Sequence, residues 1–132
     1  MADKTGFALA NARLQQAREC LQFAETGLAT ESYKGAANRS YYCIFHAMRA
    51  LLALEGFDSK KHSGVISAFR QRYTKTAIFP PNFSDIVGEA FEIRNDSDYQ
   101  DFYIVPKERV EIQIANAKTF LAAVEEYINA QR

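Results

Sequence analysis

Apolar residues recur every three or four positions along most of this chain, and that spacing constrains the fold more than any other feature. The clearest run is in the C-terminal segment, at Val110, Ile114, Ala117, Leu121, Val124 and Ile128. Steps of three and four place side chains on one face of an α-helix. Six glycines and three prolines are too few for the many tight turns of an all-β design. The sequence therefore predicts an all-α fold.

The same spacing, with its breaks, predicts five helices. We expect them over residues 5–26, with Gly27 at the end or in the last turn; over 32–55, with Ser32 as N-cap; from about 62 to 73; from an N-cap at Ser84 to 99; and from Pro106 to about 128. The connectors are short and no segment favours a strand. The prediction is an antiparallel four- to five-helix bundle that forms one domain over residues 1–132.

Composition narrows the class of protein. The formal net charge is zero, so overall charge gives no reason to expect binding to nucleic acid or membrane. Cys20 and Cys43 are too few for a disulfide framework or a zinc site, and we expect two core thiols in a reducing compartment. No apolar run is long enough to cross a bilayer, and the N-terminus lacks the apolar run of a signal peptide. We therefore expect a soluble cytoplasmic protein that needs no cofactor.

The charges are nevertheless unevenly distributed. Residues 59–84 contain five basic side chains and no acid, whereas residues 85–101 contain six acids and Arg94 as the one basic residue. Two interpretations remain open: ordinary solvated or self-complementary faces, and a phosphate-binding patch.

Arg94 lies where an apolar residue is expected. A helical stripe runs through Phe83, Ile86, Val87, Ala90 and Phe91. The next position on that face is Arg94, and Asp98 lies one turn further. A charge on a buried face is costly unless it is paired and hydrogen-bonded. This end of the helix therefore either opens into a polar cleft or interface, or brings the charges to partners inside the protein.

The second predicted helix carries two stripes, which predicts a central position in the bundle. One stripe is apolar and contains Tyr41, Ile44, Phe45, Met48, Leu51 and Leu52. The other is polar and contains Arg39, Tyr42, His46 and Arg49. The polar stripe is either solvated or faces the Arg94 end of the fourth helix. In the second case Arg39 is placed to form a bidentate pair with Asp98.

His62 is the remaining histidine, at or just before the third helix. It is either a cap or packing residue, or a general base or phosphate ligand. No metal site is expected, because the acids of the fourth helix have no histidine at ligand spacing and no cysteine cluster exists.

Three segments together resemble a known family. They are RSYYCIFHAMRALL over residues 39–52, Lys61-His62-Ser63-Gly64, and Arg94 followed by Asp98-Tyr99. The chain from about Ala8 onward resembles the HEPN domain, in its small stand-alone prokaryotic form. The resemblance implies a helical homodimer with the motif helices near the two-fold axis. It also implies a minimal nucleotidyltransferase as partner in a toxin–antitoxin arrangement, and RNA or nucleotide as ligand.

In ribonuclease members of that family, an arginine and a histidine four to six residues later form a metal-independent cleavage motif. Arg94 and Asn95 match its start, but Tyr99 stands at the histidine place. An unperturbed tyrosine hydroxyl, with a pKa of about 10, is a poor base at neutral pH. In some related pairs, the partner enzyme adds nucleotides to a tyrosine just beyond the motif histidine. Asp101 stands at that position here, so Tyr99 and Tyr103 are candidates for this modification by proximity alone.

Three functions remain open from the sequence. In the first, the chain is a weakly active or non-catalytic module that binds RNA or nucleotide through Arg94 and Arg39, with Tyr42, His46, Tyr99 and Tyr103 near the ligand. In the second, it is a ribonuclease toxin that uses Arg94 and Asn95, with His62 or Tyr99 as base. In the third, Arg94 and Asp98 form an internal ion pair in a dimerisation module without a ligand.

Overall fold

The computed structural model describes residues 4–132, which form five α-helices and one π-helical turn. The helices are α1 (Lys4–Ala29), α2 (Tyr33–Ala53), α3 (His62–Phe69), α4 (Asn82–Tyr99) and α5 (Lys107–Ala130), and the π-helical turn is η1 (Arg70–Thr74). No strand occurs within this part of the chain. The predicted all-α antiparallel bundle is therefore confirmed.

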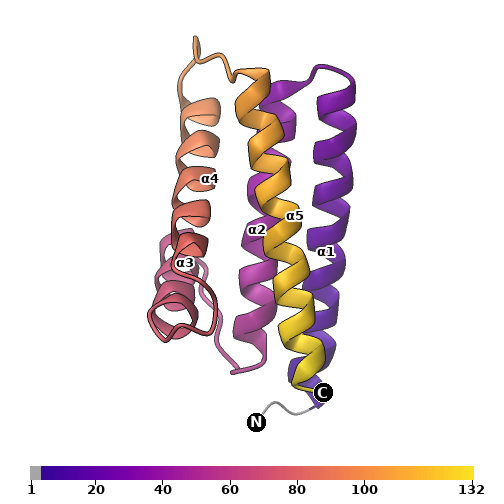
Figure 1. The fold of residues 1–132 in the computed structure, drawn as a ribbon, viewed down its shortest axis with the longest axis vertical. Coiled ribbons are helices and arrows are strands. Elements are labelled where there is room, and N and C mark those ends of the chain that lie inside the picture. Colours follow the sequence, from indigo (N-terminus) through magenta and orange to yellow (C-terminus); the bar gives the residue numbers. More distant parts are fainter. Residues whose placement is uncertain (1–3) are drawn as a thin grey trace.

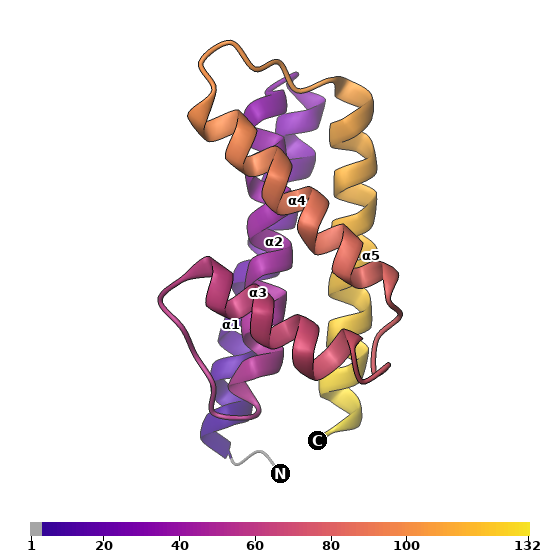
Figure 2. The same ribbon diagram turned by 90° about the vertical axis from the view of Figure 1, so that its left-hand side faces the viewer.

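The helix α2 is the centre of the bundle. It packs against α1, α3, α4 and α5. In Figure 1, α1, α2 and α5 run along the long axis, with the start of α1 and the end of α5 at the same end of the bundle. Figure 2 shows α4 and α3 crossing the same face of this group obliquely, one above the other. The predicted central position of α2 is confirmed, and α4 is held across it.

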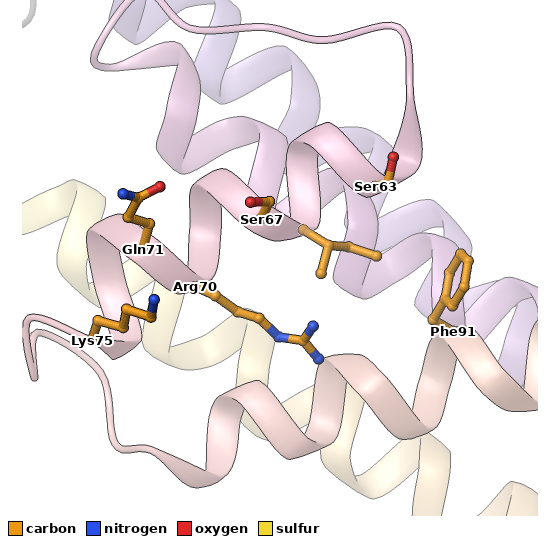
Figure 3. Close-up of a pocket in the computed structure, with 7 residues that line it drawn as sticks. Ser63, Ser67, Arg70, Gln71, Lys75 and Phe91 are labelled. Carbon is orange, nitrogen blue, oxygen red and sulfur yellow. The ribbon is translucent and has the colours of Figure 1, made fainter.

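The helix α3 continues directly into η1, where the backbone hydrogen bonds change to the π-helical spacing. Its Lys75 N–H donates to the Arg70 carbonyl at 2.9 Å, five residues back, where an α-helix would bond four residues back. Single π-helical turns inside helices are rare and often occur at functional sites. Figure 3 shows Arg70 and Lys75 on the side of this segment that faces α4.

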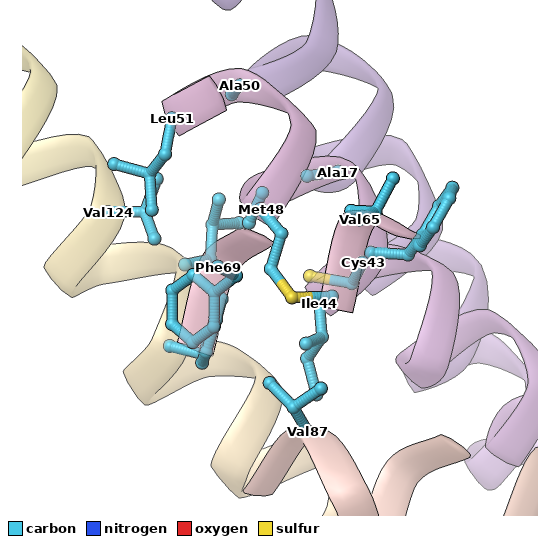
Figure 4. Packing of buried hydrophobic residues seen from close by; sticks show 14 of the residues in the cluster. Ala17, Cys43, Ile44, Met48, Ala50, Leu51, Val65, Phe69, Val87 and Val124 are labelled. Atoms are coloured by element: carbon cyan, nitrogen blue, oxygen red, sulfur yellow. The ribbon is translucent and has the colours of Figure 1, made fainter. Parts of the chain in front are cut away.

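The core is built around the apolar stripe of α2. Figure 4 shows Ile44, Met48 and Leu51 of α2 meeting Val87 of α4, Phe69 of α3 and Val124 of α5, and all six are buried. Burying side chains of this kind contributes about 1.5–3 kcal/mol each. The two cysteines also belong to this core. Burial raises the pKa of the Cys20 thiol, and it raises the pKa of the Cys43 thiol to about 12. Both cysteines are therefore buried thiols of the core, as predicted.

Some helix ends differ from the prediction. The first helix ends at Ala29, beyond the predicted Thr26, so Gly27 lies in its last turn. The missing side chain of Gly27 lets α2 approach, because a Cβ there would lie 3.2 Å from the Cβ of Ala36. The fourth helix begins at Asn82, so Ser84 lies inside its first turn and does not cap it. Ser32 is the N-cap residue of α2, as predicted, but its side chain makes no capping hydrogen bond.

Candidate functional site

Arg94 lies near the C-terminal end of α4, where the buried stripe of this helix ends. Its neighbour Ile93 is 3% exposed, and the Arg94 side chain is 16% exposed. Arg94 Nε lies 3.0 Å from the Asp98 carboxylate, one turn further along the same helix. This contact is electrostatic, because Nε makes no aligned hydrogen bond within residues 4–132. The predicted polar end of α4 is therefore an ion pair, and its acid is one third exposed.

Two tyrosines of α2 complete the surroundings of Arg94. Its Nη2 donates to the Tyr42 hydroxyl at 3.1 Å. The guanidinium carbon also lies 5.6 Å from the ring centroids of both Tyr41 and Tyr42. A cation over an aromatic face is stabilised by the ring quadrupole, which partly replaces lost hydration. Within the described chain, the Nη1 nitrogen has no partner and stays available to water or an incoming oxygen.

His62, at the start of α3, shares these tyrosines. Its Nδ1 lies 2.7 Å from the Tyr41 hydroxyl, and its ring makes an edge contact with Tyr42. The His62 ring also stacks on the ring of Phe45, with centroids 4.2 Å apart. Burial, followed by the charges of Arg94 and Arg49, lowers the pKa of His62, so the ring is neutral at pH 7. Burial also raises the pKa of Tyr41, which keeps that hydroxyl protonated.

These residues form what we call the Arg94 cluster: Arg94, Asp98, Tyr41, Tyr42 and His62. It joins three helices around one cation that has an unused donor and one neutral imidazole. Such a cluster is able to bind a phosphate through the guanidinium. It also contains a group that is able to accept a proton.

His46 lies one turn beyond Tyr42 on α2, with its ring 6.0 Å from that tyrosine. Burial, and then the charges of Arg49, Arg13 and His62, lower its pKa to about 4. The Nδ1 of His46 is buried and has no hydrogen-bond partner among the described residues. No contact of His46 with Arg94 occurs in that part of the chain, so His46 borders the cluster only through its contact with Tyr42.

The remaining predicted site residues lie outside the cluster. Arg39 is exposed, with its guanidinium 5.3 Å from the ring centroid of Phe23. The expected pair of Arg39 with Asp98 does not form, because the acid is already paired with Arg94 on its own helix. Asn95 is exposed, and Tyr99 is 73% exposed at the end of α4. Tyr103 is half-buried against the smaller apolar cluster that includes Val105.

The sequence interpretation missed one member of the site. Tyr41 was assigned to the apolar stripe of α2, and its side chain is indeed fully buried. Its hydroxyl nevertheless joins His62, and its ring joins Arg94. A buried tyrosine hydroxyl needs a hydrogen-bond partner, and this requirement is the signal by which the sequence could have indicated a polar neighbour of Tyr41.

Two further properties follow from the described residues. No group of three or more His, Cys, Asp and Glu side chains among them is arranged to hold a metal ion. None of their helices combines the length and the apolar character that crossing a membrane requires.

Comparison with known proteins gives a consistent result. The sequence model of the HEPN domain matches residues 10–127. A UPF0332 protein of Thermotoga maritima is 36% identical over 114 residues, which cover 86% of each chain. A protein of Methanocaldococcus jannaschii named "Putative toxin MJ0142" is 29% identical over 115 residues, 87% of this chain and 78% of that protein. A second protein of that organism, "Putative toxin MJ0605", is 31% identical over 88 residues, 67% of this chain and 66% of its own.

Proposed function

This chain belongs to the HEPN domain family, and from that premise we propose that it is the RNA- or nucleotide-binding component of a toxin–antitoxin-like pair. Two similar proteins carry the word toxin in their names, which supports a toxin-like role. The observation that carries the proposal is the geometry of Arg94. Its side chain is largely buried, it is fixed by Tyr42 and Asp98, and Nη1 is left free within the described chain.

A phosphate oxygen fits this unused donor. A guanidinium has five N–H donors in a fixed fork, and phosphate is one of the partners that this fork recognises. Asp98 holds the fork in orientation, and its partly exposed carboxylate is able to turn toward water when a stronger anion arrives. The two tyrosine rings shield one side of the cation from solvent.

Binding to a short single-stranded RNA, measured by fluorescence anisotropy, tests this role of Arg94. We expect Arg94→Ala to weaken binding about tenfold or more, the loss of one hydrogen bond to a charged group. The matched control is Arg39→Ala, which removes an exposed arginine of α2 outside the cluster. Equal affinities of the two variants would contradict the proposal. Urea denaturation of both variants separates lost binding from lost stability.

The proposal includes two partners. We expect a homodimer with α2 and α4 near the two-fold axis, and a complex with a minimal nucleotidyltransferase encoded beside this chain. Light scattering of the purified chain measures the first, and co-purification after joint expression measures the second. A monomer that binds no nucleotidyltransferase would remove both partners while leaving the RNA-binding test intact.

Ribonuclease activity is a second candidate function. It is favoured because His62 and Arg94 contact the same two tyrosines, Tyr41 and Tyr42. The 2′-oxygen of RNA would attack the adjacent phosphorus, its proton would pass to neutral His62, and the bond to the 5′-oxygen would break. That oxygen would take a proton from water, while Arg94 would stabilise the charge on the phosphorus oxygens. Tyr99 is less suited to the role of the base, because it is exposed and lies outside the cluster.

Cleavage of single-stranded RNA by the His62→Gln variant tests this activity. We expect wild-type protein to cleave, His62→Gln to lose the activity, and the matched variant His46→Gln to keep most of it. RNA that stays intact with wild-type protein at neutral pH would exclude this candidate. That result would leave the binding function standing.

A further inference from the structure

A groove of about 350 Å³ lies between the α3–η1 segment and α4. This volume falls in the usual range of small-molecule sites, about 300–1,000 Å³. One wall carries Ser63, Ser67 and Gln71, which are four residues apart and therefore share a helix face. None of the seven lining residues is an acid. The groove thus presents hydroxyl, amide and cationic groups, and no carboxylate faces a bound anion.

The two cations of this groove are brought together by η1. Arg70 and Lys75 both line it, although they are five residues apart. In a regular α-helix, residues five apart point roughly 140° away from each other. The bond from the Lys75 N–H to the Arg70 carbonyl widens the turn, so both side chains reach the same groove. Figure 3 shows Arg70 crossing the groove and Lys75 at one end of it.

Arg70 is held in place but its charge is not neutralised. Its Nη2 donates to the Ser84 carbonyl at 3.1 Å, and its Nε is buried without a hydrogen-bond partner within residues 4–132. Gly88 of α4 makes room for it, because a Cβ there would lie 3.0 Å from Nη2. Neither Arg70 nor Lys75 forms an ion pair with an acid of the described chain. The groove therefore contains two uncompensated positive charges, one of them on a guanidinium in a fixed position.

The other end of the groove is aromatic. Phe91 of α4 lies there, at the opposite end from Lys75 (Figure 3), and its ring centroid is 6.0 Å from that of Tyr41. An aromatic ring is a sequence-tolerant platform for a nucleic-acid base. Lys75 at one end, Arg70 across the middle and a ring at the other end match the phosphate and the base of a nucleotide.

We propose that this groove is a nucleotide site, in which Arg70 and Lys75 bind the phosphate and Phe91 contacts the base. Ser63, Ser67 and Gln71 supply hydrogen bonds between these two ends. This is a second site that adjoins the Arg94 cluster at Tyr41 but shares no residue with it, and it holds whether or not that cluster binds RNA. The same chemistry fits a free nucleotide and one unit of an RNA strand.

An NMR titration of ¹⁵N-labelled protein tests the proposal with three probes: 5′-AMP, adenosine and a short uridine oligonucleotide. We expect phosphate-bearing probes to shift the amide signals of Ser67, Gln71 and Gly88, and adenosine to leave them in place. Shifts caused by 5′-AMP assign the site to a free nucleotide, and shifts caused only by the oligonucleotide assign it to an RNA strand. If neither 5′-AMP nor the oligonucleotide moves these signals, or if only signals around Arg94 move, the proposal is overturned.

Variants make the assignment specific. We expect Lys75→Gln to weaken binding about tenfold, the loss of one charge-assisted contact, while Lys34→Gln, an exposed lysine at the start of α2, leaves it unchanged. Equal affinities of these two variants would overturn the proposal. Gly88→Ala tests Arg70 without removing it, because the added Cβ displaces the guanidinium. We expect weaker binding from a helix that is no less stable, since alanine favours helix over glycine. Unchanged binding by Gly88→Ala would show that the position of Arg70 does not matter.

Discussion

Arg13, which is buried, and Arg94, which is largely buried, differ in where their partners come from. Arg13 of α1 is 6% exposed. Its Nη1 donates to the Arg49 carbonyl of α2 at 3.0 Å, and its Nη2 lies 3.2 Å from Asp58 in the connector after α2. Asp58 is also paired with Arg49. The acid of Arg94, in contrast, is Asp98, one turn away on the same helix.

This difference separates a structural cation from one that is suited to a ligand. The Arg13 cluster (Arg13, Arg49 and Asp58) joins α1, α2 and the connector, so each contact there resists unfolding. The ion pair of Arg94 with Asp98 lies within α4 and links this helix to no other element. The hydrogen bond to the Tyr42 hydroxyl is what connects Arg94 to another helix. We therefore expect the first cluster to matter more for stability and the second more for binding.

Removing each acid in turn is the most direct way to break this comparison. We expect Asp58→Ala to lower the free energy of unfolding by about 1–2 kcal/mol, because buried Arg13 loses a charged partner and faces Arg49 uncompensated, while water screens the half-exposed carboxylate in part. Asp98→Ala should lower it by only about 0.3–0.5 kcal/mol, as for other pairs one turn apart on a helix. Urea denaturation of both variants measures the two losses.

Equal losses in those two variants would contradict the division of roles. A large loss in Asp98→Ala would mean that Arg94 and Asp98 form an internal ion pair that stabilises the bundle, which is the third function left open by the sequence.

Much of this fold follows from the sequence because it depends on periodicity. The three- and four-residue steps around Met48 and Val124 predict the faces that the structure buries. The errors occur where contacts between helices decide. Gly27 is typical of a helix end, yet close packing against Ala36 lets the helix continue through it. The π-helical turn at Arg70 has no sequence signal comparable to an apolar stripe.

The site was predictable only in part for a related reason. Arg94 and Asp98 stand out because they interrupt an apolar stripe, and one turn of helix fixes their pairing. The contact of Arg94 with Tyr42 and that of His62 with Tyr41 depend on how α2, α3 and α4 cross. Sequence spacing within one helix carries no information about such crossings.

The pH dependence of stability sharpens the comparison, because His46 responds to both clusters. Its pKa is lowered to about 4, first by burial and then by Arg49, Arg13 and His62. The unfolded chain, with a histidine pKa of about 6.5, then binds a proton before the folded chain does. We expect stability to fall as the pH decreases from about 6.5 to about 4. His46→Gln should flatten this part of the curve of unfolding free energy against pH.

Asp58 acts in a more acidic range and provides the control. Burial opposes ionisation, but hydrogen bonds from Arg49 and from the Ser59 amide, with the nearby arginine charges, lower its pKa overall. A lowered carboxyl pKa contributes stability that is present above the unfolded value and is lost as the pH falls through the folded one. Asp58→Asn should therefore change the curve mainly below about pH 4.

A His46→Gln curve that matches wild type between pH 4 and 6.5 would show that His46 is not buried in its neutral form.

The hydroxyl of Tyr42 links Arg94 to α2 through a single hydrogen bond. Tyr42→Phe removes the 3.1 Å hydrogen bond and keeps the ring beside the guanidinium. We expect a loss of about 0.5–1.5 kcal/mol in unfolding free energy, the net contribution of one such bond. RNA affinity should fall several-fold, because the fork of Arg94 is then oriented by Asp98 alone. Tyr103→Phe is the matched control, since this half-buried tyrosine lies outside the cluster. If both variants bind RNA equally well, the orientation of Arg94 by α2 does not contribute to binding, and the contrast with Arg13 would rest on stability alone.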